Sequence, residues 1–293
     1  MMENEPGYLN LIRQVLTTKR LRPNRTGIPT LSVFGAQLTF NLANKTLPLL
    51  TTKHVSFHNI ATELLWFLRG DTNQKHLEQH NVNIWQGNSS RSYLDSKGLY
   101  AYKEHESLGP IYGFQWRHFG ATYTSCHADY TNCGYDQLKR LERLIKTNPT
   151  DRTMVMSAWN PLDIDKMVLP PCHVLVQFEV DPDLSTLSAH MYQRSADLML
   201  GVPYNIASYA LFTHIMAHKC KLTADKLVCS YGNVHIYQPH VEGATLQIQR
   251  VPTAPPSIQM LFPCDLDYNQ LRVAHFKVNN YIAQQSVPFT MVV

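Results

Sequence analysis

The sequence predicts an α/β (α+β) fold: a single domain, residues 1–293, with a large mixed β-sheet flanked by helices. Apolar residues make up 44% of the 293 residues and charged residues only 16%, which suffices for a large buried core. Helical spacing of apolar residues dominates the first half of the chain, and strand-like alternation dominates after residue 153. The sequence contains no internal repeat, low-complexity tract or long flexible linker that would separate two domains.

The first elements are two helices with a strand between them. Apolar side chains at helical spacing predict a helix over residues 8–16. Alternating apolar residues then predict a strand over 31–42, with a bulge at Gly35. A second helix is predicted over 60–68, and Gly70 is its stop signal.

Loops are predicted for the middle of the chain, and strands are predicted for the second half. Residues 86–134 are expected to be mostly irregular, and a third helix is predicted over 138–145. Period-two alternation predicts strands over 174–180 and 187–191, joined by a turn. Residues 205–219 read as a long, largely apolar helix that is buried on most sides. Short strands and loops are expected in the last 40 residues.

Charge and hydropathy exclude several classes of protein. The net charge of +4 is mild and the Lys and Arg residues form no long run, so no dedicated nucleic-acid-binding arm is expected. Small anionic ligands such as phosphates suit this charge. No apolar run approaches the roughly 20 residues that a bilayer requires, and no secretory signal is visible. We therefore expect no membrane association and a cytoplasmic location, with the nucleus as an alternative.

The six cysteines do not form a recognisable metal motif. Cys-x-x-Cys pairs are absent, which disfavours a zinc ribbon. Cys126, His127 and Cys133 come nearest to a metal cluster, but their spacing fits no standard structural zinc site. We expect no bound metal and predict free thiols in a reducing cytosol.

The strongest candidate for a reacting group is Cys172. It follows Pro170 and Pro171 and leads directly into a predicted strand, so its backbone is held in one conformation. A catalytic thiol needs such a fixed position and positive charge nearby. A buried structural cysteine at the start of a strand is the commoner alternative, and local sequence does not exclude it.

Polar motifs downstream of Cys172 could supply the rest of a site. Arg194 and Ser195 could bind an anion, although a solvated turn with a surface ion pair would look the same. Asn205 enters the long predicted helix, where it could simply be a cap. His235 and Tyr237 share one face of a predicted strand. Each motif is weak alone, and their order and spacing together are specific.

Taken together, these motifs closely resemble the folate-dependent thymidylate synthases, from Arg25 to the apolar C-terminal tail. The resemblance rests on eleven stretches in the same order. They are Arg25-Thr26-Gly27, Glu63-Leu64-Leu65-Trp66-Phe67, Gly70-Asp71-Thr72-Asn73, Ile84-Trp85, Gly109-Pro110-Ile111-Tyr112-Gly113, Gln115-Trp116-Arg117, Ser157-Ala158-Trp159-Asn160, Pro171-Cys172-His173, Gln193-Arg194-Ser195, Asn205-Ile206-Ala207-Ser208-Tyr209 and His235-Ile236-Tyr237. The segments 88–102 and 113–120 look like the eukaryotic and viral branch. The length leaves no room for a fused dihydrofolate reductase domain, so the monofunctional form is expected.

The resemblance implies the thymidylate synthase fold and the reductive methylation of dUMP to dTMP. The co-substrate would be 5,10-methylenetetrahydrofolate, which gives a carbon and a hydride and leaves as dihydrofolate; no metal is implied. Cys172 matches the nucleophile that adds to C6 of the pyrimidine, and Arg194 matches an arginine near the sulfur and the phosphate. Glu63 and Tyr112 match groups that move protons. Asn205 matches the amide that reads uracil, where related dCMP hydroxymethylases have a carboxylate.

The resemblance also implies binding residues for both substrates. Those for dUMP are Arg25, Arg152, His173, Gln193, Ser195, Asn205, His235 and Tyr237. Those for the folate are Lys53, Trp85, Asn88, Asp197 and Val292. The C-terminal tail resembles a lid that excludes water. A homodimer is implied, with Arg152 donated across the interface.

Four positions depart from the family pattern. Thr153 stands where a second arginine is usual, and Pro29 stiffens the loop that carries Arg25. His54 replaces an arginine, and Asn233 replaces an aspartate. None of these changes removes a reacting group, so we expect altered nucleotide or folate affinity.

Two other functions are compatible with the scaffold. The same early chemistry could end with water adding to the carbon, which gives hydroxymethyl-dUMP. Trp85 and the tail are both present, and they favour dTMP. A non-catalytic nucleotide- or RNA-binding protein could have lost Cys172, Glu63 or Asn205, and all three are present. Incidental RNA binding stays open.

Overall fold

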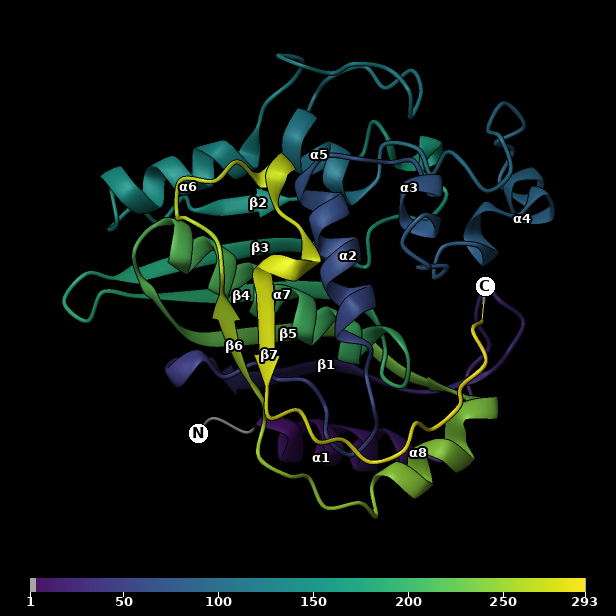
Figure 1. The fold of residues 1–293 in the computed structure, drawn as a ribbon. Coiled ribbons are helices and arrows are strands. Elements are labelled where there is room, and N and C mark those ends of the chain that lie inside the picture. Colours follow the sequence, from purple (N-terminus) through teal and green to yellow (C-terminus); the bar gives the residue numbers. More distant parts are fainter. Residues whose placement is uncertain (1–3, 293) are drawn as a thin grey trace.

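A five-stranded mixed sheet lies at the centre of the computed structural model, which describes residues 4–292 (Figure 1). The strand order is β1-β5-β4-β3-β2. The strands are β1 (Thr30–Asn41), β2 (Val155–Ser157), β3 (His173–Asp181), β4 (Thr186–Asp197) and β5 (Thr223–Tyr237). Neighbouring strands are antiparallel except β4 and β5, which are parallel and are joined by the crossover helix α7 (Gly201–Lys219). The predicted mixed sheet flanked by helices is confirmed.

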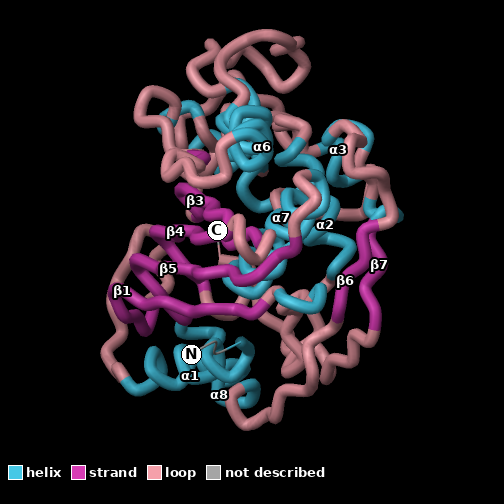
Figure 2. The backbone as a smooth tube through the Cα atoms, turned by 90° about the vertical axis from the view of Figure 1, so that its left-hand side faces the viewer, coloured by secondary structure: helices cyan, strands magenta, loops and turns pink. Residues whose placement is uncertain are grey.

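The helices α2, α6 and α7 lie on one side of this sheet, and the opposite face is open (Figure 2). Besides α7, the helices are α1 (Asn4–Thr17), α2 (Phe57–Leu68), α3 (Lys75–Glu78), α4 (Arg91–Ser96), α5 (Tyr112–His118), α6 (Gln137–Thr147) and α8 (Val241–Gln247). A second sheet pairs β6 (Ser257–Met260) with β7 (Phe276–Asn279) in antiparallel fashion. These short strands and the loops around them agree with the expectation for the last 40 residues.

Helix α7 forms the middle of the core, as its apolar sequence predicts. Fifteen of the 19 residues of α7 are buried. The ring of Phe212 stacks on Trp116 of α5 at 5.6 Å between centroids, and it meets Phe178 of β3 edge-on at 5.4 Å. The crossover helix therefore packs between α5 and β3 of the sheet.

One expectation about local structure is confirmed and another is wrong. Residues 86–134 are mostly irregular, as expected, although α4 and α5 also lie in this segment. Most residues of α5 are buried, so no polar stripe alternates with an apolar one and the helical period is hidden. The bulge expected at Gly35 is absent, because Phe34 pairs with Asn233 and Ala36 with Tyr231 in one continuous register. Gly35 does adopt a positive φ of 79°.

Two site-bearing segments also differ from expectation. Strand β4 continues to Asp197, so Gln193 to Asp197 lie inside the strand and not in a turn after it. Helix α7 begins at Gly201 with Leu200 in the cap position, so Asn205 is inside the helix and does not cap it. The side chains of both segments are therefore placed by regular backbone.

All six cysteines are free thiols. Among residues 4–292, no helix has both the length and the apolar character needed to cross a membrane. The expectation of free thiols is confirmed.

Candidate active site

The three central strands bring motifs from distant parts of the sequence to one end of the sheet. In the antiparallel pair β3–β4, His173 lies opposite Gln193. In the parallel pair β4–β5, Ser195 lies beside Asn233 and Asp197 beside His235. The register of the sheet, rather than any one loop, therefore assembles the predicted site.

Cys172 lies directly before β3, with Arg194 beside it. The backbone N–H of Arg194 donates to the Cys172 carbonyl at 2.8 Å. Its guanidinium donates from Nε to the carbonyl of Pro171 at 2.9 Å and from Nη2 to that of Pro170 at 2.7 Å. The ring of Trp159 lies 5.5 Å from the guanidinium carbon. These contacts fix the cation, and within residues 4–292 they leave Nη1 without a hydrogen bond, available to an anion.

The Cys172 thiol is protonated at rest. Burial raises the pKa of Cys172 above its usual value, whereas Arg194, the Tyr112 hydroxyl and Arg25 act to lower it. The expected effect of Arg194 on the thiol is therefore present, but burial outweighs it. The three groups reduce the cost of forming the thiolate when a substrate arrives.

Tyr112 contacts the backbone of the candidate nucleophile. Its hydroxyl oxygen accepts the N–H of Cys172 at 2.7 Å. The ring stacks on His173 at 4.1 Å, and Nδ1 of His173 is hydrogen-bonded to the Tyr209 hydroxyl at 2.9 Å. Burial and the nearby Cys172 raise the pKa of Tyr112 well above its usual value, and burial lowers the pKa of His173 to about 3. Both rings are therefore neutral, and Tyr112 is a phenol.

Glu63 of α2 has a pKa close to neutral pH. Its Oε1 accepts the indole N–H of Trp85 at 2.8 Å. Burial raises the pKa of Glu63 to about 7, and the hydrogen bond from Trp85 partly opposes this shift. The Trp85 ring also meets Tyr112 edge-on at 6.2 Å. A carboxyl group with such a pKa can both give and take a proton under physiological conditions.

The amide of Asn205 is held by its neighbour on β4. Gln193 donates from Nε2 to Oδ1 of Asn205 at 3.0 Å and to the carbonyl of Ser195 at 2.9 Å. Gln193 is only 1% exposed, so this contact is shielded from water. The orientation leaves Nδ2 of Asn205 as a donor and a second lone pair on Oδ1 as an acceptor.

His235 and Tyr237 lie at the end of β5, and the family resemblance assigns them to the deoxyribose of dUMP. Their rings meet edge-on at 5.2 Å. Nδ1 of His235 lies 2.9 Å from Oδ1 of Asn233, and burial lowers the pKa of His235. The neutral ring donates from Nδ1 and keeps Nε2 as an acceptor. Asn233 thus orients the histidine through its own side-chain oxygen, although the family pattern has a carboxylate there.

Two of the predicted folate residues share contacts near the start of α7. Oδ1 of Asp197 accepts the N–H groups of Met199 at 2.9 Å and Leu200 at 3.2 Å. Nζ of Lys53 donates to the carbonyl of Met199. Burial lowers the pKa of Lys53 to about 8, and Asp197 opposes this shift. The ammonium group also lies 4.7 Å from the centre of the Phe289 ring in the tail.

Two further predicted folate residues, Asn88 and Val292, make fewer contacts. Asn88 is buried, and its backbone N–H donates to the carbonyl of Trp85 at 3.1 Å. Val292 is half-buried at the end of the described chain. Val293, the last residue of the apolar tail, lies outside the described residues.

The structure does not bring both remaining arginines to Cys172. Arg25 is exposed, but its charge lowers the pKa of Cys172 and of Tyr237, so it lies near them. Arg152 is exposed, and within residues 4–292 its side chain makes no hydrogen bond or ion pair. Its neighbour Thr153 is bound through Oγ1 and its carbonyl to Arg140 of α6, both at 2.7 Å. Of the two positions 152 and 153, only Arg152 therefore offers a free cation beside the edge strand β2.

The weak metal candidate does not form as the sequence suggested. Cys126 and His127 approach Glu106, and Cys133 is not part of this group. The carboxylate of Glu106 is bound by Lys75 at 2.8 Å, with His127 at 3.4 Å. The hydrogen bond from Lys75 is the main reason that the pKa of Glu106 is lowered to about 2. The geometry is that of an ion-pair cluster.

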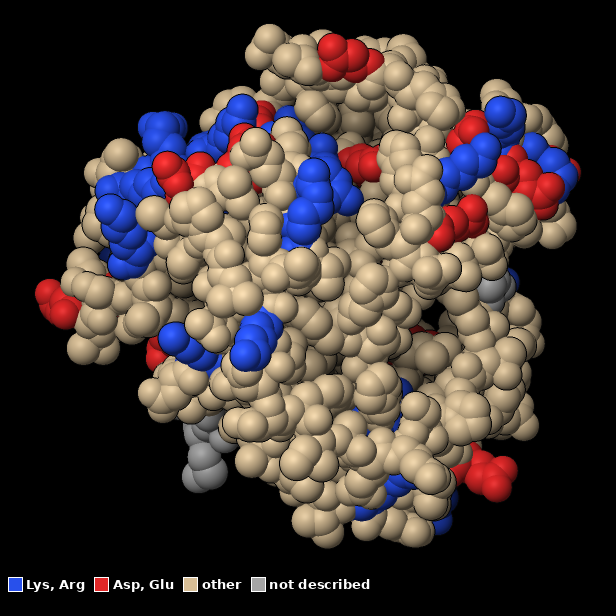
Figure 3. Space-filling model, in the orientation of Figure 1, with Lys and Arg blue, Asp and Glu red and all other residues tan. Residues whose placement is uncertain are grey.

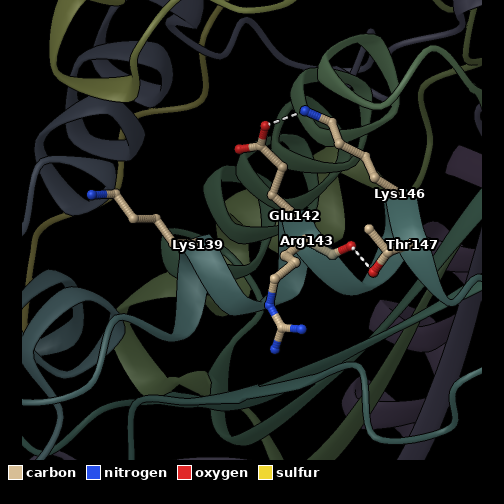
Figure 4. A pocket seen from close by; sticks show the side chains of 5 residues that line it. All are labelled: Lys139, Glu142, Arg143, Lys146 and Thr147. Atoms are coloured by element: carbon tan, nitrogen blue, oxygen red, sulfur yellow. Dashed lines mark hydrogen bonds and ion pairs between the residues drawn. The ribbon is translucent and has the colours of Figure 1, made fainter.

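Two surface hollows lie away from the predicted site. One, of about 360 Å³, runs along α6 between Lys139, Glu142, Arg143, Lys146 and Thr147 (Figure 4). The other, of about 780 Å³, lies between the ends of α2 and α5 and the loop 126–134. Basic side chains gather over α6 on the face shown in Figure 3. Neither hollow is lined by a predicted site residue.

Sequence reasoning missed two residues that support the site. Tyr209 holds His173, and Trp159 lies against Arg194. Both belong to stretches that carried the family resemblance, and their aromatic character was the only signal. Their role follows from contacts across the fold, which single motifs do not show.

The fold and the candidate site have the features of an enzyme that uses nucleophilic catalysis: a half-buried thiol, a fixed guanidinium and a carboxyl group with a pKa of about 7. The family model described as thymidylate synthase matches residues 6–293. The chain belongs to the thymidylate synthase family. The family reaction is the methylation of dUMP to dTMP, with methylenetetrahydrofolate as co-substrate, which makes its members methyltransferases.

Relatives from fungi and plants support the assignment. The chain is 47% identical over 295 residues to the thymidylate synthase of Agaricus bisporus, which covers 99% of both chains. It is 53% identical over 260 residues to a probable thymidylate synthase of Schizosaccharomyces pombe, which covers 87% of this chain and 41% of that protein. A bifunctional dihydrofolate reductase-thymidylate synthase of Zea mays is 47% identical over 286 residues, and the chain spans 54% of its length. The chain thus spans about half or less of two of these relatives and nearly all of the third.

Proposed function

We propose that this chain catalyses the reductive methylation of dUMP to dTMP, with 5,10-methylenetetrahydrofolate as donor and dihydrofolate as second product. The observation that carries the proposal is the convergence of Cys172, Arg194 and Asn205 at one end of β3 and β4. The amide of Asn205 offers a donor and an acceptor, which match O4 and N3–H of uracil. Nη1 of Arg194 offers a donor to the phosphate.

Cys172 starts the reaction by adding to the pyrimidine. Its thiol loses a proton while Arg194 and Arg25 stabilise the negative charge on sulfur. A bond then forms between sulfur and C6, and the electrons of the C5–C6 double bond move toward O4. Asn205 donates to this developing oxyanion. C5 becomes nucleophilic and forms a bond to the one-carbon unit of the donor. Once C5 has lost its proton, the bond between that carbon and the folate nitrogen breaks, and the folate then gives a hydride to the transferred carbon and leaves as dihydrofolate.

Glu63 and Tyr112 handle the protons that follow. Glu63 has a pKa of about 7, so it can exchange protons with O4 through water. The proton on C5 must leave before the methyl group is complete. Because the pKa of Tyr112 is well above its usual value, we assign it to relaying this proton to water as a phenol. Cys172 is finally expelled as the C5–C6 double bond reforms.

The residues around Asp197 and Trp85 suit a folate. Trp85 presents a largely buried indole that lies edge-on to Tyr112, which gives a planar ring an apolar wall. Asp197 uses Oδ1 for the turn before α7, and Oδ2 stays available to accept N–H groups of a ring. Lys53, Asn88 and Val292 complete the proposed folate set.

The product of the reaction tests the proposal directly. We expect the protein, dUMP and methylenetetrahydrofolate to give 5-methyl-dUMP, with one dihydrofolate formed per nucleotide consumed. Mass spectrometry identifies the nucleotide, and absorbance follows the folate. A 5-hydroxymethyl product would instead support the alternative in which water adds to the carbon. Binding of dUMP without any product would contradict the assignment.

We also propose that the chain forms a homodimer through the open face of the large sheet. Phe34 of β1 is 82% exposed, and Val155 of β2 and Tyr192 of β4 are exposed beside the buried neighbours Met156 and Met191 of the same strands. Such a surface is unusual in a monomer. Arg152 lies next to β2 and is free to reach a partner's phosphate site. Ser195, His173, His235 and Tyr237 would bind the same nucleotide from within one chain.

Mixing two inactive variants tests whether Arg152 acts across the interface. Arg152→Ala and Cys172→Ala should each be inactive or nearly so as homodimers. A mixed dimer would contain one site with both residues intact, so about a quarter of the wild-type activity should return after exchange of subunits at equal amounts. Sedimentation velocity confirms the dimer. Activity that stays at the level of the parents would mean that Arg152 serves its own chain.

Location and domain structure complete the proposal. Free thiols at all six cysteines suit a reducing compartment, and we propose the cytoplasm, with the nucleus as an alternative. We propose no membrane association and no dedicated nucleic-acid site. Residues 1–293 would form one domain; residues 1–3 and 293 lie outside the described part.

A further inference from the structure

A buried histidine holds the C-terminal tail against the body of the protein. His240 ends the short turn Gln238–His240 after β5 and is 1% exposed. Its Nε2 lies 2.8 Å from the carbonyl oxygen of Thr290. Because a carbonyl oxygen only accepts, Nε2 carries the proton and donates it. Nδ1 is buried without a hydrogen-bond partner in the described residues, so the ring is committed to this one contact.

A row of side chains links the predicted sugar site to this contact. The ring of Tyr237 lies 5.2 Å from His235 and 5.7 Å from His240. His240 in turn meets the ring of Phe289 at 5.1 Å, and Phe289 lies under the ammonium group of Lys53. Residues that would hold the deoxyribose are therefore in contact with the tail through His240.

The tail has a second anchor that does not involve His240. Arg250 donates to the carbonyl of Gln285 at 2.6 Å, and the N–H of Gln284 donates to the carbonyl of Thr51 at 2.8 Å. The chain is thus fixed up to residue 285, and Figure 1 shows it crossing α8 before it ends. Beyond that point His240 supplies a hydrogen bond to the tail.

Helix α8 provides the surface on which the last residues lie. A Cβ atom at Gly243 would lie 2.5 Å from the Phe289 ring and 2.9 Å from Val287. A side chain there would force the tail to move, while the helix itself accepts alanine readily. Gly243 therefore gives a way to displace the tail without changing His240.

We propose that His240 is a positioning residue that keeps the tail closed over the donor site and ties closure to the bound nucleotide through Tyr237. The proposal rests on the proposed function. With the tail closed, the C5-bound carbon receives hydride and the folate leaves as dihydrofolate. With the tail loose, water adds its oxygen to that carbon instead, the hydride stays on the folate, and tetrahydrofolate and hydroxymethyl-dUMP leave.

Two substitutions at His240 separate the hydrogen bond from the ring. His240→Phe keeps an aromatic ring beside Tyr237 and removes the donor. His240→Gln places an amide N–H near the position of Nε2 and should restore the contact with Thr290. We expect His240→Phe to raise KM for methylenetetrahydrofolate about five- to tenfold, the effect of one hydrogen bond, and to leave the Kd of dUMP within about twofold.

The ratio of dihydrofolate formed to dUMP consumed is the decisive readout. We expect a ratio of one for wild type and His240→Gln, and a lower ratio with hydroxymethyl-dUMP for His240→Phe and Gly243→Ala. A merely structural role would change stability or kcat and leave this ratio at one. A ratio of one in His240→Phe, or a lowered ratio only in Gly243→Ala, would overturn the assignment to His240.

A readout independent of turnover keeps this proposal separate from the proposed function. Carboxypeptidase releases residues from a C-terminal tail only when the tail is loose. With dUMP bound, digestion should be several-fold faster in His240→Phe than in wild type, and His240→Gln should be protected. Equal rates of digestion in His240→Phe and wild type would overturn the proposed role of His240. A wild-type protein that makes no dTMP would refute the proposed function, and the digestion result would still decide the role of His240.

Discussion

Cys172→Ala should abolish dTMP formation, with kcat reduced by about 10⁴-fold or more. Without sulfur, no covalent bond to C6 can form, and C5 of the uracil ring stays a poor nucleophile. The effect should exceed that of any binding residue, because the remaining groups can only position substrates. Mass spectrometry of the nucleotide after prolonged incubation measures the loss down to a small residual rate.

Binding measurements distinguish lost chemistry from lost structure in this variant. Arg194 is held by the carbonyls of Pro170 and Pro171 and not by the sulfur, so dUMP should still bind to Cys172→Ala. Cys220→Ala is the matched control. Burial raises the pKa of Cys220 to about 12, and no role in the reaction is proposed for it, so its variant should turn over normally. Substantial dTMP formation by Cys172→Ala would refute the assignment of the nucleophile.

The sheet was predictable because its strands carry a strong period. The alternation over 174–180 and 187–191 reports one buried face and one open face, and the structure places strands there. The long apolar run of α7 likewise predicts a buried helix. Helix α5 escaped prediction because its aromatic residues are buried all round, so burial left no contrast between faces.

The site was predictable in its reacting groups and not in their electrostatics. Order and spacing singled out Cys172, Arg194 and Asn205. No motif shows that burial outweighs Arg194 at the thiol, or that burial brings the pKa of Glu63 to about 7. Such shifts depend on what covers a group, which comes from segments far away in the sequence.

The effects of the departures from the family pattern also depend on contacts that the sequence does not show. Asn233 keeps the hydrogen bond to His235, although it lacks the charge of aspartate. Thr153 lacks the positive charge of the arginine that is usual at this position, and it accepts hydrogen bonds from Arg140 of α6 instead. The consequence for nucleotide binding depends on what these side chains touch, so sequence alone could only predict that affinity changes.

Glu63→Gln should lower kcat by about 10²- to 10⁴-fold and at the same time stabilise the fold at alkaline pH. The amide keeps an oxygen that can accept the indole N–H of Trp85, so the packing is preserved. It cannot exchange a proton, which removes the relay. Wild-type activity in Glu63→Gln would show that water exchanges protons with O4 without help from this carboxyl group.

The stability effect follows from the sign of the pKa shift. The pKa of Glu63 is raised from the usual 4.5 to about 7 by burial, so the fold favours the neutral acid. The contribution to stability is fully present below about pH 4.5, declines as pH rises toward 7, and is lost above it. The difference between these two pKa values corresponds to at most about 3.4 kcal/mol, and solvent screening of this half-buried side chain reduces it to about 1–2 kcal/mol.

Urea denaturation at pH 5 and pH 8 measures this difference. At pH 5 the free energies of unfolding of Glu63→Gln and wild type should nearly agree, and at pH 8 the variant should be the more stable. Asp183→Asn makes the same change of carboxyl to amide in the exposed turn between β3 and β4, so its difference from wild type should not grow with pH. Parallel pH dependence in Glu63→Gln and wild type would mean that Glu63 is ionised in the fold. A carboxylate already ionised at pH 5 could accept protons only weakly at pH 7, and the proposed relay would then need a different acid.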